Sequence, residues 1–319
     1  MEFRVLKITI GICLMMMTFS CSKAVKVKIP GYVEKIVIEG SIETDGFPFV
    51  LISKNKDVYS PVSQKETLGS YLPGAKVWVS DGTTTIQLTE ICTNNLPAGM
   101  DTVVANFLGV PIDLLHEVTI CAYVGLDGNF VGEVGKTYSL RVEFEGEVYE
   151  AASKILNPIP LTSSYWKEEE KTPDYGFSHH ILQDPPVERN GYLYEVKRLN
   201  VDSTGEAKDK RYHKPFLPYF DDEFFNGLSF EFFMDNSATY GDKTIDSKYR
   251  GYFGRGDTLE IKFSNYEHPL FRFYNAIVQQ KMAGGSPFSL PTNAVGNISN
   301  GALGIWVALS PSYSTLVCE

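Results

Sequence analysis

The segment from Pro215 to Gly227 (PFLPYFDDEFFNG) holds the densest set of residues that could do chemistry. Three neighbouring acids lie between two aromatic pairs, and the candidate binding loop comprises Tyr219, Phe220, Asp221, Asp222, Glu223, Phe224 and Phe225. A glycoside hydrolase needs two carboxylates roughly 5–10 Å apart, but no distant second carboxylate stands out here. The alternating oxygen ligands of an EF-hand are also missing. The segment therefore suits a ligand- or partner-binding surface, or a turn with its rings in the core and its acids in water.

The histidines and the standard catalytic motifs give little support for an enzyme. His179 and His180 are adjacent, but neighbouring strand residues point to opposite faces, so one metal ion could not readily bind both. The chain contains no G-x-S-x-G, H-E-x-x-H, P-loop or dinucleotide fingerprint. We therefore predict no catalytic residues, no metal and no cofactor. The tripeptide Arg255-Gly256-Asp257 matches an adhesion motif, although it also fits a turn that enters a strand.

Cys92 and Cys121 are the two cysteines that could pair. A disulfide between them would close a loop of about 30 residues and stabilise the fold by roughly 3–4 kcal/mol in the chain-entropy model. Two buried thiols in neighbouring strands fit the sequence equally well. Cys318 has no obvious partner, and no Cys/His spacing is typical of a zinc site.

The N-terminus predicts export and lipid anchoring. Residues 1–20 combine a basic start with an apolar run from Ile8 to Phe19, which is too short to span a bilayer but fits a signal peptide. A small residue before Cys21 is typical of bacterial lipoprotein signals, in which cleavage frees the cysteine for lipidation. The alternative is an ordinary secretory signal with an incidental cysteine. We expect a lipid on Cys21 to attach the protein to the membrane and residues 21–30 to form a tether.

Composition excludes some partners and favours strands. The 319 residues include 29 Lys+Arg and 39 Asp+Glu, which give a net charge of −10. A nucleic-acid-binding surface needs clustered basic residues, so we expect no nucleic-acid partner. Hydrophobic residues make up 43% of the chain and aromatic residues 13%, which is enough for a packed core and typical of β-structure. The length suggests two domains.

The first domain, residues 31–157, is predicted to be a β-sandwich. Polar and apolar residues alternate from residue 34 to 42, as in a half-buried strand. Asp81-Gly82 and Glu145-Gly146 fit two-residue type I′ turns and predict two hairpins. The strands of these and neighbouring elements are expected at residues 34–42, 49–53, 76–80, 83–88, 138–144 and 147–152. The irregular stretch between the hairpins predicts a short helix near residues 103–115.

Two prolines in Asn157-Pro158-Ile159-Pro160 predict a stiff connector to a second β-rich domain, residues 158–319, of sandwich or barrel-like form. Its strands are expected at residues 180–183, 192–199, 228–234 and 257–263. One covering helix is predicted near residues 266–282 from apolar residues at helical period. It would begin with a Ser264–Glu267 capping box or with His268 as N-cap. The charged run at residues 167–171 (KEEEK) is expected to lie in solvent.

The order of short motifs along the chain resembles the Bacteroidota lipoprotein family known as domain of unknown function 4249. The motifs that carry the resemblance are Phe19-Ser20-Cys21, Ile36-Val37-Ile38-Glu39-Gly40, Pro73-Gly74-Ala75-Lys76-Val77, Gly135-Lys136-Thr137-Tyr138-Ser139-Leu140, Gln183-Asp184-Pro185-Pro186, Asp221-Asp222-Glu223-Phe224-Phe225-Asn226-Gly227, Gly256-Asp257-Thr258, Gly285-Ser286-Pro287-Phe288-Ser289, Asn297-Ile298 and Gly301-Ala302-Leu303-Gly304. Each motif is weak alone, but the ordered set spans nearly the whole chain.

The resemblance implies an outer-membrane lipoprotein with an immunoglobulin-like N-terminal domain and a β-rich C-terminal domain. Members of the family are associated with TonB-dependent outer-membrane receptors, which implies an accessory ligand- or partner-binding subunit in nutrient uptake. The family supplies no catalytic residues. A surface glycan hydrolase and a structural or adhesive surface lipoprotein are the alternative functions, and the sequence does not choose between the periplasmic and the cell-surface face.

Overall fold

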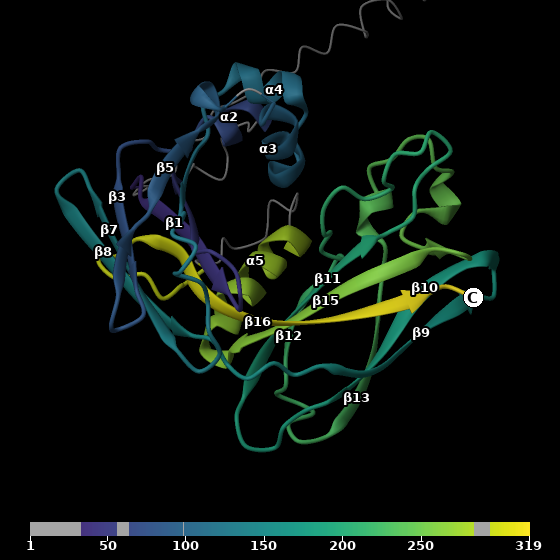
Figure 1. The fold of residues 1–319 in the computed structure, drawn as a ribbon. Helices are drawn as coiled ribbons and strands as arrows, with labels where there is room; N and C mark the ends of the chain where they lie inside the picture. Colours follow the sequence, from purple (N-terminus) through teal and green to yellow (C-terminus); the bar gives the residue numbers. More distant parts are fainter. Residues whose placement is uncertain (1–32, 56–63, 98, 284–293) are drawn as a thin grey trace, which may run out of the picture. The chain divides into compact units, whose positions relative to one another are not determined.

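The computed structural model describes residues 33–55, 64–97, 99–283 and 294–319 (Figure 1). Strands dominate these ranges and form open sheets, so the predicted mainly β, sandwich-like fold is confirmed. In the described ranges, every helix is too short or too polar to cross a membrane. Cys21, with the predicted signal and tether, lies outside the described residues.

The largest sheet has eight strands in the order β12-β11-β15-β16-β1-β2-β6-β5. Its strands are β1 (Ile36–Glu43), β2 (Phe49–Lys54), β5 (Thr89–Cys92), β6 (Cys121–Val124), β11 (Asn190–Arg198), β12 (Tyr219–Asp221), β15 (Thr258–Glu267) and β16 (Leu303–Val317). The long β16 pairs in parallel with β1 and antiparallel with β15. One sheet therefore joins strands from both sides of the expected boundary between residues 157 and 158.

A second sheet, ordered β4-β3-β7-β8, packs against the N-terminal strands. It consists of β3 (Lys76–Ser80), β4 (Thr85–Gln87), β7 (Thr137–Phe144) and β8 (Glu147–Lys154). Alternate side chains such as Val77 and Leu140 point inward and meet Ile38, Ile52 and Trp306 in a shared core. The other face of this sheet points to solvent because the side chains of a strand alternate between faces.

The two predicted hairpin turns differ. Glu145 and Gly146 both have positive φ, and Phe144 pairs with Glu147, so the predicted two-residue turn is present. The prediction for Asp81-Gly82 is wrong, because Ser80 pairs with Thr85 and a four-residue loop joins the strands. The Asp81 carboxylate holds this wider loop by accepting hydrogen bonds from the following threonine N–H groups, and these bonds lower the pKa of Asp81.

The third sheet lies over the C-terminal core. It contains β9 (Leu161–Glu169), β10 (Thr172–Gln183), β13 (Ser229–Met234) and β14 (Phe253–Gly254), with β10 at its centre. Inward residues such as Leu182 meet Ile261 and Phe263 of β15. The charged run at residues 167–171 ends β9 and forms the hairpin to β10, and its side chains are exposed or partly exposed, as predicted.

Short helices fill the connections. They are α2 (Gln64–Leu68), α3 (Asp101–Leu108), α4 (Ile112–Glu117) and α5 (Phe271–Ala283), with 3-10 turns at Thr93–Asn95, Ser237–Thr239, Ser247–Tyr249 and His268–Leu270. The helix expected near residues 103–115 is split, since Gly109 has φ 68° and ends α3. The predicted Ser264–Glu267 capping box is wrong, because β15 continues to Glu267. The alternative is wrong as well, because His268 is not an N-cap but the first residue of the 3-10 turn before α5. Phe273 of α5 packs on Ile305 and Val307 of the large sheet.

Candidate functional site

The predicted binding loop contacts a second loop. Residues 222–228, between β12 and β13, lie against residues 184–189, between β10 and β11, and we call these two segments the paired loops. Asp184 joins them: its carboxylate accepts hydrogen bonds from the Gly227 N–H at 2.8 Å and from the Tyr192 hydroxyl. Gly227 has φ 76° and no room for a Cβ beside Pro186, so the contact depends on glycine.

Asp222 makes the second contact between the paired loops. It is 0% exposed, accepts a hydrogen bond from Arg189 Nε at 2.6 Å and another from the Asn190 N–H at 2.8 Å. A buried carboxylate needs such partners because removal from water is costly. Both oxygens of Asp222 are thus used to hold the loop from β10 to β11 in place.

The other two acids of the segment do not form an opposed carboxylate pair with Asp222. Asp221 lies 3.0 Å from His268 Nε2 at the start of the 3-10 turn before α5. Glu223 is exposed. Asp222 is buried, Asp221 pairs with His268 and Glu223 points to solvent. This arrangement stabilises the loop and does not suit bond cleavage.

The aromatic residues of the segment also divide. Tyr219 stacks on Tyr274 of α5 with ring centroids 4.0 Å apart, and Phe220 lies against the C-terminal core. Phe225 is buried and stacks on Phe230 at 4.3 Å. Phe224, by contrast, is 89% exposed. Residues 219–225 therefore contribute one protruding ring, Phe224, while Phe216 earlier in the segment is also exposed.

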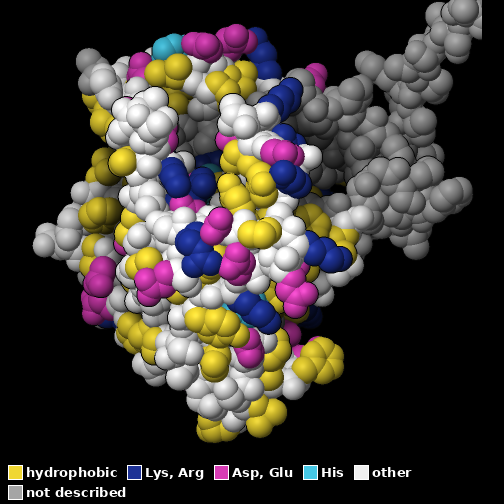
Figure 2. All heavy atoms as spheres, turned by 90° about the vertical axis from the view of Figure 1, so that its right-hand side faces the viewer, with side chains coloured by type: hydrophobic (Ala, Val, Ile, Leu, Met, Phe, Trp, Pro, Cys, Tyr) yellow, Lys and Arg dark blue, Asp and Glu magenta, His cyan; other side chains and the backbone are white. Residues whose placement is uncertain are grey.

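A second protruding residue comes from the other loop. Val187 is 87% exposed, and Leu228 at the end of the paired loops is also exposed. Hydrophobic side chains gather at the lower end of the view in Figure 2, whereas basic and acidic side chains alternate above them. The sequence analysis did not include residues 184–189 among the candidates, because only the folded chain brings Asp184 and Gly227 together across 43 positions.

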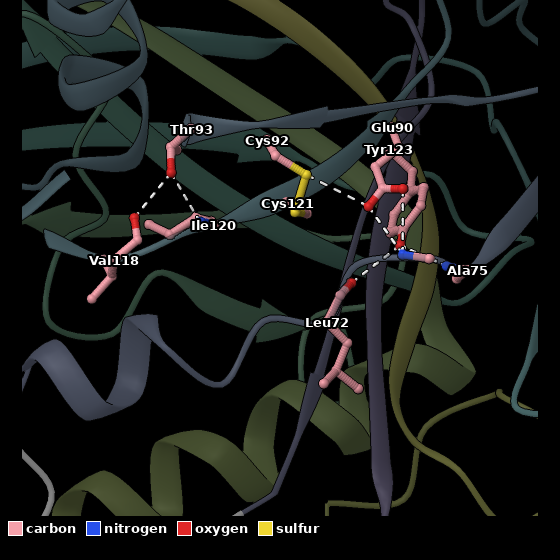
Figure 3. Close-up of a disulfide and its surroundings, with 10 residues drawn as sticks. Leu72, Ala75, Glu90, Cys92, Thr93, Val118, Ile120, Cys121 and Tyr123 are labelled. Atoms are coloured by element: carbon pink, nitrogen blue, oxygen red, sulfur yellow. Dashed lines mark hydrogen bonds between the residues drawn. A yellow bond between two sulfur atoms is a disulfide. The ribbon is translucent and has the colours of Figure 1, made fainter. Parts of the chain in front are cut away.

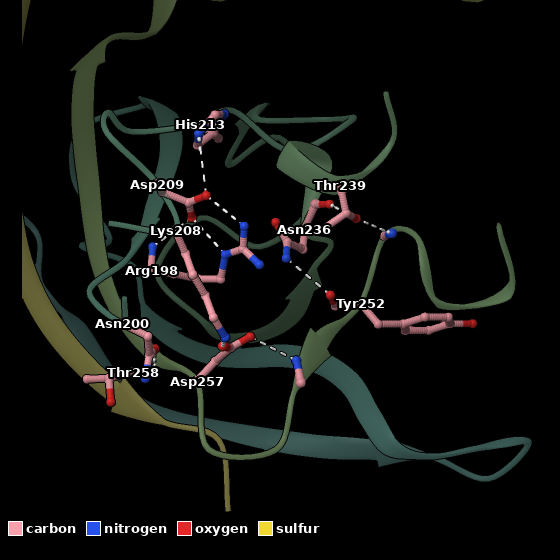
Figure 4. Close-up of polar contacts among 12 residues, drawn as sticks. Arg198, Asn200, Lys208, Asp209, His213, Asn236, Thr239, Tyr252, Asp257 and Thr258 are labelled. Atoms are coloured by element: carbon pink, nitrogen blue, oxygen red, sulfur yellow. Dashed lines mark hydrogen bonds and ion pairs between the residues drawn. The ribbon is translucent and has the colours of Figure 1, made fainter. Parts of the chain in front are cut away.

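A partly buried charge network lies where β11 ends and β15 begins (Figure 4). Arg198 donates two hydrogen bonds to the Asp209 carboxylate, at 2.9 and 2.7 Å. Lys208 donates to Asp257 at 2.7 Å. The Asp257 carboxylate also accepts from the Gly254 N–H, so the acid of the Arg255-Gly256-Asp257 tripeptide is buried in a turn before β15. The turn interpretation of this tripeptide is the one that the structure matches.

The structure joins Cys92 and Cys121 in a disulfide between paired residues of β5 and β6 (Figure 3). The Glu90 carboxylate lies 3.5 Å from Cys92 Sγ and accepts hydrogen bonds from the Gly74 N–H. Glu90 and the two sulfur atoms are close enough to surround a metal ion, but the sulfur atoms are bonded to each other. Cys318 is buried in the C-terminal core, where burial raises the pKa of its thiol to about 12.

The two adjacent histidines face opposite sides of β10, as their positions in a strand predict. His180 is buried next to Tyr194 and Phe232, and its Nδ1 lies 2.8 Å from Ser164 Oγ. Burial lowers the pKa of His180 to about 3, so its ring is neutral at ordinary pH. His179 stacks on Tyr165 on the outer face. The pair does not converge on one point.

Comparison with known families gives one result for almost the whole chain. The model described as Domain of unknown function (DUF4249) matches residues 23–313. Among curated proteins, none matches the sequence.

Proposed function

The chain belongs to the DUF4249 family, and on that premise we propose that it is a lipid-anchored outer-membrane protein that binds a partner, as the accessory subunit of a TonB-dependent nutrient uptake system. One observation carries the proposal. The paired loops present Phe224 and Val187 almost fully exposed on a base fixed by buried hydrogen bonds. Exposed apolar side chains that gather on two touching loops, here together with Leu228, are typical of contact sites for another protein.

The fixed backbone of the paired loops favours binding. Binding costs free energy when loops and side chains must be ordered, and a preorganised surface avoids part of that cost. Asp184 and Asp222 fix the backbone of both loops before any partner arrives. An exposed aromatic ring on such a base can fill a pocket of a partner and account for much of the binding energy.

The use of the acids also favours binding over hydrolysis. A glycoside hydrolase needs two carboxyl groups that face the same bond. Asp222 instead gives both of its oxygens to Arg189 and Asn190, inside the protein. Substrate bonds would therefore compete with contacts that keep the paired loops together.

The membrane attachment in this proposal depends on Cys21. A single acyl chain binds a bilayer only marginally, whereas the several chains of a lipoprotein cysteine give a stable anchor. Replacing Cys21 by alanine in the full chain should therefore move the protein from the outer-membrane fraction to the soluble fraction. Receptor binding alone would retain some of the variant, so the lipid itself is measured by feeding cells labelled palmitate. Absence of label on the wild-type protein, or equal label on Cys21→Ala, would show that the lipid anchor is wrong.

The partner is tested by affinity purification from detergent-solubilised outer membranes of cells that make the tagged full chain. We expect the wild-type protein to recover a β-barrel receptor of the TonB-dependent class, and the Phe224→Ser/Val187→Ser variant to recover at least tenfold less. Phe47→Ser is the matched control, because Phe47 is also exposed but lies in the turn between β1 and β2. Failure of the wild-type protein to recover any such receptor overturns the proposal.

A further inference from the structure

An open groove of about 680 Å³ lies on the solvent face of the β4-β3-β7-β8 sheet, of which β3, β7 and β8 are labelled side by side in Figure 1. This volume falls within the roughly 300–1,000 Å³ typical of ligand sites. The groove is far in sequence from the paired loops, and none of its residues was a candidate in the sequence analysis. Its shape follows from the register of the four strands.

Two neighbouring rows of side chains make the groove. One row contains small residues, which leave a depression across the strands: Thr85, Ser80, Ser139 and Ala152. The next row contains large residues, which form a wall: Gln87, Trp78, Arg141 and Glu150. Three strand spacings give a floor about 14 Å long, which is more than one sugar ring requires.

Ion pairs hold the polar part of the wall in place. Arg141 lies directly opposite Trp78 in the strand register and donates to Glu150 at 2.8 Å and to Glu143 at 2.8 and 3.2 Å. The three charged side chains remain partly exposed, so they can still bond to a ligand. Their summed charge is −1, which disfavours an anionic ligand.

We propose that this groove binds a neutral glycan. The half-buried Trp78 side chain offers an aromatic surface for the apolar face of a sugar ring. The Arg141–Glu150 pair offers both donors and acceptors for sugar hydroxyls, and Ser139 adds a hydroxyl group on the floor. The Ser80 hydroxyl is already bonded to Gly82, Thr84 and Thr85, so it shapes the floor without serving the ligand. The inference concerns a different surface from the paired loops and stands without the proposed receptor.

The test is native affinity electrophoresis of the full chain in gels that contain one polysaccharide each. The neutral probes are hydroxyethyl cellulose, amylopectin, galactomannan and arabinoxylan, and the anionic probe is polygalacturonate. We expect at least one neutral polysaccharide to retard the wild-type protein and polygalacturonate to leave its mobility unchanged. Absence of retardation by all four neutral probes, or retardation by polygalacturonate alone, overturns the proposal.

Variants of the groove test whether the polysaccharide binds there. Trp78→Ala should weaken binding of the retarding polysaccharide at least tenfold. Ala152→Tyr should have the same effect by filling the floor at an exposed position, which keeps the test valid if Trp78→Ala does not fold. Phe224→Ser/Val187→Ser should be retarded like the wild type, whether or not it loses the receptor. Unchanged retardation of both groove variants contradicts the proposal, as does a wild-type dimer that Trp78→Ala converts to a monomer in light scattering.

Discussion

In the paired loops the carboxylates of Asp184 and Asp222 are buried and bonded to the protein itself, while apolar Phe224 and Val187 point to solvent. In the groove the arrangement is reversed. Arg141 and its acidic partners stay partly exposed, and Trp78 is half-buried in the wall. The first surface suits a protein with an apolar pocket, whereas the second suits a hydroxyl-rich ligand.

The difference shows that residue type alone does not assign a role to a charged segment. Three consecutive acids at residues 221–223 are the most visible cluster in the sequence, yet burial turns Asp222 into a structural residue. No motif in the sequence marks Arg141 and Glu150 as site residues, yet strand register places them in one row with Trp78. If this division is right, substitutions should affect stability strongly in the base of the paired loops and weakly in the groove.

The largest difference is expected between two adjacent phenylalanines. Phe225→Ala should lower the free energy of unfolding by about 3–5 kcal/mol, because it leaves a cavity where Phe225 stacks on Phe230. Phe224→Ala should change it by less than about 0.5 kcal/mol, because the ring makes little contact with the protein. Urea unfolding of the two variants measures both. Equal effects would contradict the assignment of Phe224 to the surface and Phe225 to the support.

A smaller loss of stability is expected when Asp222 is replaced. Asp222→Ala should cost about 2–4 kcal/mol, because the Asn190 N–H loses its buried acceptor and Arg189 loses its ion pair. The partial exposure of Arg189 limits the cost. Glu223→Ala is the matched control and should unfold like the wild type, as Glu223 is exposed. A wild-type midpoint for Asp222→Ala would show that the paired loops are not held by this acid.

The two histidines of β10 also differ in burial, and this difference should make the stability of the fold depend on pH. His180 keeps a pKa of about 3 when folded, below its ordinary value of roughly 6.5, so the unfolded chain takes up the proton first. Stability from this group is complete above pH 6.5 and is lost as the pH falls toward 3. Between pH 7 and pH 5 the loss should be about 2 kcal/mol.

Denaturant unfolding at the two pH values measures this change. Ser164 lies against the His180 ring, Tyr194 and Phe232 pack beside it, and His179 on the other face adds a weaker repulsion to its protonation. His180→Gln should remove most of the change in stability between pH 7 and pH 5. His179→Gln, on the exposed face, should keep it. A wild-type slope in His180→Gln contradicts the neutral buried ring.

The smallest effect is expected in the groove. Arg141→Ala should leave the Tm within about 2 °C of the wild type, because exposed ion pairs contribute little to stability. A thermal melt followed by circular dichroism measures this shift. A loss of 5 °C or more would mean that the groove charges hold the sheet together, and would remove the contrast with the paired loops.

Local patterns predicted local structure well. The turn at Glu145-Gly146 follows from its two residues, and the strand at residues 34–42 from its alternation of apolar and polar residues. Asp81-Gly82 failed as a tight turn because the Asp81 side chain closes a wider loop, which depends on Thr83 and Thr84 as well. The split helix near residues 103–115 could have been foreseen from Gly109 and Pro111, which end and begin helices.

Long-range pairing was not predictable from the sequence. The 15-residue strand β16 is missing from the predictions, although it pairs with β1 and β15 at the centre of the large sheet. Its first half is apolar on both faces, so it lacks the alternation that marks a half-buried strand. The contact of Asp184 with Gly227 and the row from Trp78 to Glu150 also arise only from pairing of distant segments.

Photo-crosslinking in living cells shows directly whether the exposed tips of the paired loops contact a TonB-dependent receptor. A photoreactive phenylalanine analogue is placed at position 224 in one strain and at position 78 in another. We expect a crosslink to a β-barrel receptor from position 224 and none from position 78, since Trp78 lies in the groove. No receptor crosslink from position 224, or a stronger one from position 78, would contradict it.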